Sequence, residues 1–316
     1  MSDSTVQYDK TITVAEFAEI FGVRPDELPV QAREVIETAD FRYRVLTGIE
    51  LLSTYIRVFK TLLTPIPKEK VSGPHRKGVW EKGWGENLEG FTKTGDLKEL
   101  RAKFVRLKEL IRYKGHYIDP ADAHFEENFV KVLRHFLFRK YFTNTKQIYE
   151  FGFGAGLNLV AASAIFPDKK LIGLDWASAS AQIASKLAEV KKMNITGRVF
   201  DLFNPDETLK IEPNSAVFSI GTLEQTGRNF KAFTDYLIRQ KPAICINIET
   251  MYEVYNKFSL FDCVAASYLK KRNYLRGYLT YLRELEKAGK VEILEVKRTF
   301  GSFYHDGYTY IVWRPK

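Results

Sequence analysis

A glycine-rich turn near the middle of the chain is the pattern with the clearest chemical meaning. A short apolar run ends at Glu150, and Gly152, Gly154 and Gly156 follow it at alternate positions. A second apolar run ends at Asp175. A strand that ends in a carboxylate, turns on glycines and opens a helix is how an open α/β sheet presents its edge to a nucleotide. The pattern therefore predicts a nucleotide-type ligand at this edge.

The spacing of the glycines narrows the kind of ligand. Gly152 and Gly154 permit a tight turn and close approach of a ligand, and Gly156 lets the next helix begin against the strand. The order Gly-x-Gly-x-Gly differs from the Gly-x-Gly-x-x-Gly of dinucleotide oxidoreductases. The turn can therefore lie beneath a cofactor without cradling a pyrophosphate.

Residues after the second and third predicted strands complete the nucleotide edge. The carboxylate of Asp175 can accept hydrogen bonds from both ribose hydroxyls, and Trp176 beside it offers a flat apolar face for a base. The third strand is predicted to end at Asp201, which could accept an exocyclic amino group. Either Phe200 or Leu202 would then wall the ring of the base.

Strands and helices alternate from residue 147 onward, which predicts an α/β fold with a parallel sheet and right-handed crossovers. Strands are predicted at 147–151, 170–175, 197–201, 215–220, 243–249, 291–299 and 308–313, and helices at about 156–166, 178–192, 229–239 and 262–288. The last two strands are so close in sequence that they should form a hairpin, which reverses the final strand.

The first part of the chain is predicted to be mainly helical. Thr13 can cap an early helix, and apolar residues recur at helical spacing from about 30 to 63. A basic helix is expected over about 96–112, and Asp119-Pro120 is expected to open a long helix that ends near residue 142.

Residues 64–95 are rich in proline and glycine, and they also contain Trp80 and Trp84. Loops of this length usually form lids, binding loops or linkers. Because tryptophans do not suit a linker, we expect a packed loop over the site. The alternative is that the two tryptophans only staple the loop to the core.

Together these features resemble the class I S-adenosylmethionine-dependent methyltransferases. The resemblance covers about residues 120–316, and it includes the terminal hairpin, since the sheet of that family ends with one reversed strand. It implies a Rossmann-like, seven-stranded, mostly parallel sheet with a reversed last strand. Residues 1–119 would form a mainly helical N-terminal cap, and residues 120–316 would form the cofactor-binding domain.

The resemblance also implies S-adenosylmethionine as the cofactor. Glu150 and the three glycines would hold its methionine end, and Asp175 would bind the ribose. Asp201 and Leu202 would contact the adenine, with Trp176 offering its ring beside them. Gly221, which follows the fourth strand, is assigned to the cofactor as well.

A narrower resemblance lies in the C-terminal third of the chain. Residues 220–227, 271–275 and 300–308, together with the final Trp313-Arg314-Pro315, are similar to segments of sugar O-methyltransferases. Those enzymes belong to surface-polysaccharide or glycan-modifying pathways. The resemblance implies methylation of a hydroxyl group on a sugar, a glycan or another small polar acceptor, in polysaccharide biosynthesis.

Methyl transfer to a hydroxyl oxygen needs close positioning, exclusion of water and a base. His305, in the closing hairpin, is the predicted base because an imidazole titrates near neutral pH. Glu224, after the fourth strand, or Glu249, at the end of the fifth, would orient His305 or act as the base directly. The structural alternatives are a surface turn for His305, a helix cap for Glu224 and an arginine partner for Glu249.

The charge of the chain leaves other functions open. The formal net charge is +9, and part of the excess lies at residues 93–114. An RNA methyltransferase that uses this region is one alternative, although no RNA-binding module is recognisable and a solvated helix face explains the charges as well. A basic surface also suits an anionic glycan or a nucleotide-linked acceptor. A non-catalytic interaction protein that retains the fold is the second alternative.

Other features set the expected environment. Cys245 and Cys263 have no Cys-x-x-Cys spacing, so reduced thiols in a cytoplasmic protein are expected. No apolar stretch is long enough for a membrane span, and no secretory signal is recognisable. Acidic and histidine residues lack the spacing of metal ligands, so no metal site is predicted. A homo-oligomer is left open.

Overall fold

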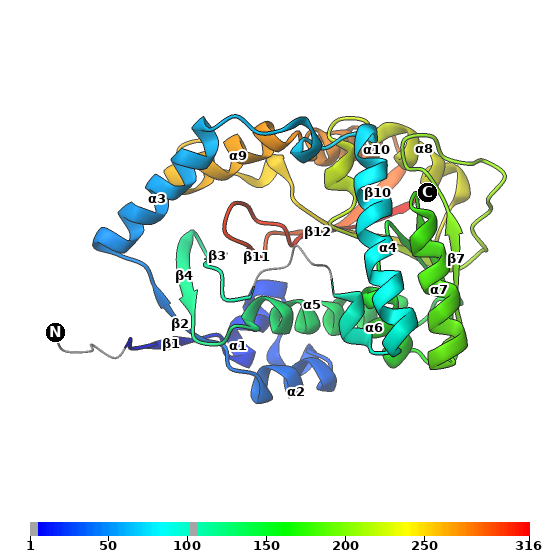
Figure 1. Ribbon diagram of the computed structural model, residues 1–316, viewed down its shortest axis with the longest axis horizontal. Helices are drawn as coiled ribbons and strands as arrows, with labels where there is room; N and C mark the ends of the chain where they lie inside the picture. Colours follow the sequence, from blue (N-terminus) through cyan, green and yellow to red (C-terminus); the bar gives the residue numbers. More distant parts are fainter. Residues whose placement is uncertain (1–5, 102–106) are drawn as a thin grey trace.

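A seven-stranded sheet forms the centre of the protein, seen here in a computed structural model that describes residues 6–101 and 107–316 (Figure 1). The order of its strands is β10-β12-β9-β8-β5-β6-β7. These strands are β5 (Gln147–Phe151), β6 (Lys170–Asp175), β7 (Ile195–Val199), β8 (Ser215–Ile220), β9 (Ile244–Glu249), β10 (Val291–Lys297) and β12 (Thr309–Pro315).

The direction of the strands confirms the predicted fold class. Strands β5 to β9 pair in parallel, whereas β12 runs antiparallel to both of its neighbours, β9 and β10. Parallel neighbours need long crossovers, which the helices supply, while the short connection from β10 to β12 only allows a reversal. Thr309 pairs with Glu249, which places the tip of the hairpin beside the carboxyl end of β9.

Helices cover both faces of this sheet, and alternate residues of each strand face opposite layers. In β5, Ile148 packs in a cluster with residues of α5, α6 and α7, whereas Tyr149 and Phe151 pack in a second cluster with residues of α8 and α10. The helices are α5 (Phe125–Phe142), α6 (Leu157–Ile165), α7 (Ser178–Lys191), α8 (Lys231–Gln240), α9 (Leu260–Arg272) and α10 (Tyr278–Lys287).

The N-terminal part combines helices with a second sheet that the sequence analysis did not anticipate. The order of this five-stranded sheet is β1-β2-β4-β3-β11. Its elements are α1 (Val14–Phe21), α2 (Val30–Thr38), α3 (Gly48–Leu63), α4 (Lys77–Thr94), β1 (Lys10–Thr11), β2 (Arg42–Val45), β3 (Ile111–Tyr113), β4 (His116–Pro120) and β11 (Phe300–Gly301). Because β11 belongs to the closing hairpin, this sheet joins the two parts of the chain. The division between residues 119 and 120 stays a prediction.

The expectation of a long loop at residues 64–95 was wrong, because α4 occupies most of it (Figure 1). Its glycines lower the intrinsic helix propensity by about 1 kcal/mol each relative to alanine. Packing compensates for this cost. Trp80 and Trp84 stack on each other with ring centroids 5.4 Å apart, Phe91 is buried, and α4 lies along α7.

Three other expectations were wrong in part. The helical pattern of residues 30–63 is interrupted by β2, in which Tyr43 is buried and pairs with Lys10 of β1. The Asp119-Pro120 pair ends β4, and α5 begins only at Phe125. The helix expected at 262–288 is divided into α9 and α10, because Asn273 adopts a left-handed conformation (φ 52°).

The basic helix expected over 96–112 is not seen in the described part of that range. A 3₁₀ turn, η4 (Leu97–Leu100), and strand β3 occupy its two ends. Residues 102–106 lie outside the described residues.

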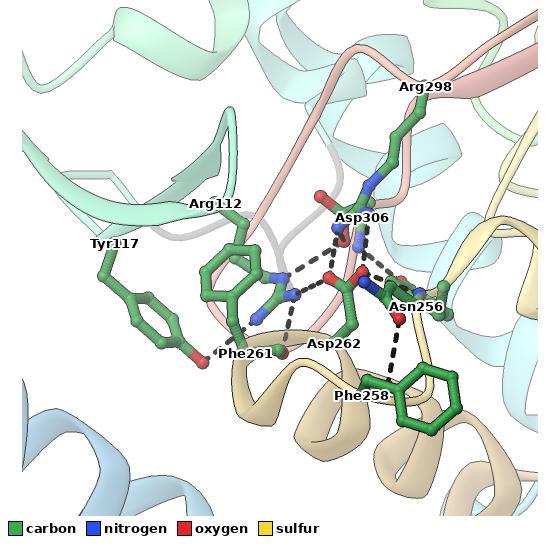
Figure 2. Close-up of polar contacts among 9 residues, drawn as sticks. Arg112, Tyr117, Asn256, Phe258, Phe261, Asp262, Arg298 and Asp306 are labelled. Atoms are coloured by element: carbon green, nitrogen blue, oxygen red, sulfur yellow. Dashed lines mark hydrogen bonds and ion pairs between the residues drawn. The ribbon is translucent and has the colours of Figure 1, made fainter.

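A buried cluster of four charged side chains ties the second sheet to the hairpin and to α9 (Figure 2). Arg112 of β3 is fully buried, and its Nε lies 3.2 Å from Oδ2 of Asp306. Its Nη2 lies 3.5 Å from Oδ1 of Asp262 in α9. Arg298 reaches the same two carboxylates: its Nη2 lies 2.6 Å from Oδ1 of Asp262 and 3.0 Å from Oδ2 of Asp306. Burial opposes ionisation of Asp262, but the hydrogen bonds from Arg298 hold the pKa of its carboxyl below the ordinary value.

Replacing Arg112 by methionine should lower the free energy of unfolding by about 3–5 kcal/mol, because it leaves buried carboxylates with one cationic partner instead of two. Urea denaturation measures the change. Arg24→Met is the control, since the Arg24 side chain is 73% exposed and forms only surface ion pairs, worth about 0–1 kcal/mol. An equal loss of unfolding free energy in the two variants would contradict a structural role for the cluster.

Candidate functional site

The glycine-rich turn follows β5 and is packed tightly against neighbouring segments. Gly152, Gly154 and Gly156 have φ values of 71°, 52° and 82°, in the left-handed region that favours glycine. A Cβ atom on Gly152 would lie 2.0 Å from Cγ2 of Thr222. Thr222 also donates from Oγ1 to the carbonyl of Gly152 at 3.1 Å. The turn therefore needs glycine both for its conformation and for this close approach.

Asp175 lies against this turn, a contact that the sequence analysis did not anticipate. Its Oδ2 accepts a hydrogen bond from the backbone N–H of Gly154, and its Oδ1 accepts one from Ala177, each at 2.9 Å. The side chain is buried, and burial raises the pKa of the carboxyl to about 6, although these backbone hydrogen bonds oppose the shift. In this arrangement Asp175 fixes both the turn and the start of α7.

Glu150 faces the layer of α5 and α6 and is fully buried. Its Oε1 accepts a hydrogen bond from Nδ2 of Asn158 at 2.8 Å, and Asn158 in turn accepts one from Nη1 of Arg134 at 2.9 Å. Oε2 of Glu150 has no hydrogen-bond partner among the described residues. Burial raises the pKa of Glu150 to about 8, while Asn158 and the charge of Arg134 oppose the rise.

The residues assigned to the adenine end lie next to one another. Trp176 stacks on Phe203, with ring centroids 5.7 Å apart. Asp201 lies just beyond the end of β7, where its Oδ1 accepts a hydrogen bond from the N–H of Phe203 at 2.9 Å. Leu202 packs against the apolar cluster on the side of α8 and α10. The structure thus brings Trp176 and Asp201 to Phe203, which the sequence analysis did not name, whereas the side chain of Leu202 belongs to the apolar cluster.

Helix α4 lies across this edge of the sheet, beside α7 (Figure 1). Glu81 accepts hydrogen bonds from the N–H groups of Ser178 and Ala179, at 2.7 and 3.0 Å, and so caps α7 from outside. Trp84 covers the turn: a Cβ atom on Gly154 would lie 2.7 Å from its ring. The segment that was expected to pack over the site as a loop therefore lies against the glycine turn as a helix.

Glu249 holds the segment that follows β8. It is fully buried, and its carboxylate accepts hydrogen bonds from Oγ of Ser219 at 2.7 Å and from the N–H groups of Thr222 and Glu224 at 3.1 Å each. Burial raises the pKa of Glu249 to about 7, and these hydrogen bonds oppose the rise. Gly221, in the same segment, is exposed, with φ 61°. These bonds favour a positioning role for Glu249.

Glu224 sits between two arginines that the sequence analysis did not assign to the site. Its Oε1 accepts a hydrogen bond from Gln225 at 2.9 Å, and Gln225 accepts one from Nη1 of Arg76 at 2.5 Å. Burial and the charge of Glu249 raise the pKa of Glu224 to about 8, whereas Arg272 and Arg76 lower it. Arg76 belongs to the 3₁₀ turn η3 (Pro74–Arg76), directly before α4.

His305 is packed among tyrosines. Its ring stacks on that of Tyr268, with ring centroids 5.6 Å apart, and meets the ring of Tyr274 edge-on, with centroids 5.4 Å apart. Burial lowers the pKa of His305 to about 4, although the charge of Asp306 opposes the shift. Among the described residues, Nδ1 of His305 has no hydrogen-bond partner, so neither Glu224 nor Glu249 orients it through that nitrogen.

Tyr274 connects the two predicted catalytic groups. Its ring contacts His305, while burial and the nearby charge of Glu224 raise its pKa. Arg272 lies over the ring of Tyr274 at 4.9 Å and over Tyr268 at 5.7 Å. The site thus brings a neutral imidazole, a carboxyl group and a guanidinium together on a wall of aromatic rings.

Comparison of the sequence with models of protein families and with curated proteins finds no match. Among solved structures, the [4+2]-cyclase SpnF is similar with a TM-score of 0.49 and 12% identity, over 80% of this chain and 98% of that chain. The structure of PigF with SAH has a TM-score of 0.41 and 18% identity, over 60% and 59% of the two chains. A SAM-dependent methyltransferase from Aquifex aeolicus has a TM-score of 0.38 and 16% identity, over 56% of this chain and 86% of that chain.

At these identities and TM-scores the likeness carries no functional argument. Function has to be inferred from this chain's own residues.

Two further observations bear on the predicted environment. No helix of residues 6–101 and 107–316 is long and apolar enough to cross a membrane. Within the same ranges, no three His, Cys, Asp or Glu side chains are grouped so that they could hold a metal ion.

The pH dependence of stability should report the buried state of Glu150. In the folded protein this carboxyl keeps its proton up to about pH 8, whereas the unfolded chain loses it near the ordinary value of 4.5. The folded state therefore binds more protons in this interval, and the free energy of unfolding falls as the pH rises through it.

Glu150→Gln should remove that part of the slope. Relative to the wild type, the variant should gain about 1 kcal/mol or more between pH 5 and pH 8, since one pKa unit corresponds to about 1.4 kcal/mol. Urea denaturation at several pH values measures the slope. Glu37→Gln, at an exposed position of α2, is the control and should keep the wild-type slope. A Glu150→Gln slope equal to that of the wild type would refute the assignment.

Proposed function

We propose that this chain is an S-adenosylmethionine-dependent methyltransferase. The observation that carries the proposal is the reversed strand β12, inserted between β9 and β10 in a sheet whose neighbouring strands β5 and β6 carry Glu150 and Asp175 at their carboxyl ends. The family that the sequence resembles has a sheet that ends with one reversed strand. The glycine turn lies between the two acids, as a cofactor at this edge requires.

The cofactor would lie along the carboxyl edge of β5, β6 and β7. The unpartnered Oε2 of Glu150 is suited to the methionine ammonium group. Without the cofactor this buried carboxyl keeps its proton up to about pH 8, and the ammonium charge would favour its ionised form. Asp175 could accept ribose hydroxyls, since a carboxylate has about four lone-pair sites and backbone N–H groups use two of them. Trp176 and Asp201 would meet the adenine.

Access to this edge would require a movement of α4. Trp84 fills the space directly above Gly154, so a ligand that approached the turn closely would have to displace the indole. Helix α4 would then close over the cofactor and help to exclude water, which methyl transfer needs.

The acceptor is proposed to be a hydroxyl group of a sugar or another small polar molecule. Tyr304 is partly exposed and would meet a sugar ring, with the buried Tyr268 stacked behind it, and Arg76 and Arg272 offer hydrogen-bond donors to the sugar oxygens. When bound, the cofactor would supply a sulfonium methyl group for in-line attack by the acceptor oxygen, with S-adenosylhomocysteine as the leaving group. The acceptor hydroxyl would pass its proton to a base of the protein.

His305 is the better candidate for that base. Its imidazole is neutral at pH 7 and can take a proton, whereas Glu224, with a pKa of about 8, already carries one. Glu249 would position Glu224 through the backbone instead of touching the acceptor. A pKa of about 4 makes His305 a weak base, so positioning would supply most of the catalysis.

RNA as the acceptor has less support. Among the described cations of residues 93–114, Arg112 is buried in the cluster of Figure 2, and Lys93, Arg101 and Lys114 pair with glutamates. A protein that keeps the fold without catalysis would bind the cofactor but would not turn it over. The proposal also includes a cytoplasmic location and a role in polysaccharide biosynthesis, and it allows association as a homo-oligomer.

Asp175→Ala should weaken the binding of S-adenosylmethionine by about ten-fold or more, because a hydrogen bond to a charged group contributes about 1.5–3 kcal/mol. Isothermal titration calorimetry measures the affinity. Asp168→Ala, which removes an exposed carboxylate between α6 and β6, is the control and should bind like the wild type. Unchanged affinity of Asp175→Ala would remove the basis for this placement of the cofactor.

His305→Ala should reduce turnover by about a hundred-fold while the affinity for S-adenosylmethionine stays near that of the wild type, since general-base catalysis contributes factors of about 10²–10⁴. Turnover is followed with a labelled methyl donor and a panel of sugar acceptors. If the variant turns over at the wild-type rate, His305 is not the base.

A further inference from the structure

A cavity of about 940 Å³ lies between α8, α9 and α10, away from the glycine turn. Helix α9 lies between the cavity and the tyrosines around His305. Cys263 and Lys270 face the cavity, whereas Tyr268 and Leu269 pack in the apolar cluster that also includes Tyr304. Tyr255 and Ala266 contact both, but none of the predicted acceptor-site residues lines the cavity. The cavity is therefore distinct from the predicted acceptor site. Its volume lies within the range of about 300–1,000 Å³ typical of small-molecule sites.

Positive charge predominates on its walls. Five cationic side chains line it, and none of them forms an ion pair with a described residue: Arg228, Lys231, Lys257, Lys270 and Arg276. They come from four separate segments of the chain. Arg228 and Lys231 lie just before and at the start of α8, and Lys257 lies in the loop before α9. Lys270 lies near the C-terminal end of α9, and Arg276 lies in the connection from α9 to α10.

The acidic residues of the cavity do not offset this charge. Asp262 is held by Arg298 and Arg112, as Figure 2 shows. Glu253 accepts a hydrogen bond at 2.5 Å from the N–H of Gly277, and burial raises its pKa. Only Glu284 lies exposed at the rim.

Two of the cations lie over aromatic rings, and a third is poorly compensated. The ammonium groups of Lys231 and Lys270 lie over the rings of Tyr281 and Tyr252, at 4.9 and 5.3 Å. Nε of Arg276 is buried without a hydrogen-bond partner among the described residues. Clustered cations repel one another and raise the local concentration of anions.

We propose that this cavity is a second binding site, for a small ligand that carries two adjacent phosphate groups, such as a nucleoside diphosphate. Five cations exceed what one carboxylate or one monoanion would need. The arginine forks suit phosphate oxygens, and the lysines add point charges around them. A concave site between three helices suits a small molecule better than an extended polymer. The inference does not depend on the proposed methyl transfer.

Calorimetric titration of the full chain with inorganic pyrophosphate, UDP and uridine, at low and high salt, tests the proposal. Pyrophosphate and UDP should bind saturably with one site per chain, uridine should not bind, and salt should weaken both complexes. Tighter binding of UDP than of pyrophosphate would show that the site also contacts the nucleoside. Equal affinities would show that it recognises the diphosphate alone. No saturable binding of either phosphate compound would overturn the proposal.

A charge-matched pair of variants locates the binding. The double substitution Lys231→Gln and Lys270→Gln removes two exposed cations of the cavity and should weaken pyrophosphate binding about ten-fold or more. Lys287→Gln with Lys290→Gln removes the same charge from the exposed end of α10 and the turn before β10, and should leave pyrophosphate binding unchanged. Circular dichroism verifies the fold of both.

Equal losses in the two variants would mean nonspecific attraction and would overturn the proposal. Tighter binding of a single-stranded RNA oligonucleotide than of pyrophosphate, weakened only by the cavity variant, would assign the surface to RNA and would also overturn it. The affinity for S-adenosylmethionine should be the same in all variants, so failure here is distinguishable from failure of the proposed function.

Discussion

The insertion of β12 between β9 and β10 is the constraint on which the proposed site depends. The pairing of Thr309 with Glu249 sets the register, and so the tip of the hairpin must lie at the carboxyl edge of the sheet. The pairing of Phe300 with Tyr113 and the ion pairs of Asp306 then fix that tip against the N-terminal sheet. One strand reversal therefore brings His305 to the edge where the glycine turn and the acidic strand ends already lie.

A second constraint is the cost of burying acids at this edge. Glu150, Glu224 and Glu249 are enclosed close to the strand ends, and burial raises the pKa of each. The fold compensates in different ways. Glu249 accepts backbone N–H groups, Glu224 lies near Arg76 and Arg272, and Glu150 is left with one oxygen unpartnered. A carboxylate that the fold leaves incompletely satisfied is where a cationic group of a ligand is most useful.

Helix α4 and the second sheet show where local patterns were insufficient. The glycines of α4 lower its helix propensity, so the sequence favoured a loop, but the stacked tryptophans and the packing on α7 decide in favour of a helix. Strands β2, β3 and β4 are short. Although β3 and β4 form a local hairpin, β2 pairs with β4 and β3 pairs with β11, which joins segments far apart in the sequence. Arg134, Asn158, Glu81 and Arg76 were missed for the same reason, since each acts through a partner in another element.

The sequence by itself determined the parallel core. Apolar runs that end in acids, glycines at alternate positions and two closely spaced final strands are local signals, and they correctly predicted the sheet and its reversed strand. Only the tertiary structure decided which charges are compensated, what covers the turn and where cations gather around the cavity beside α9. The reason is physical: strand and turn formation depend on near neighbours, whereas burial and ion pairing depend on residues that folding alone brings together.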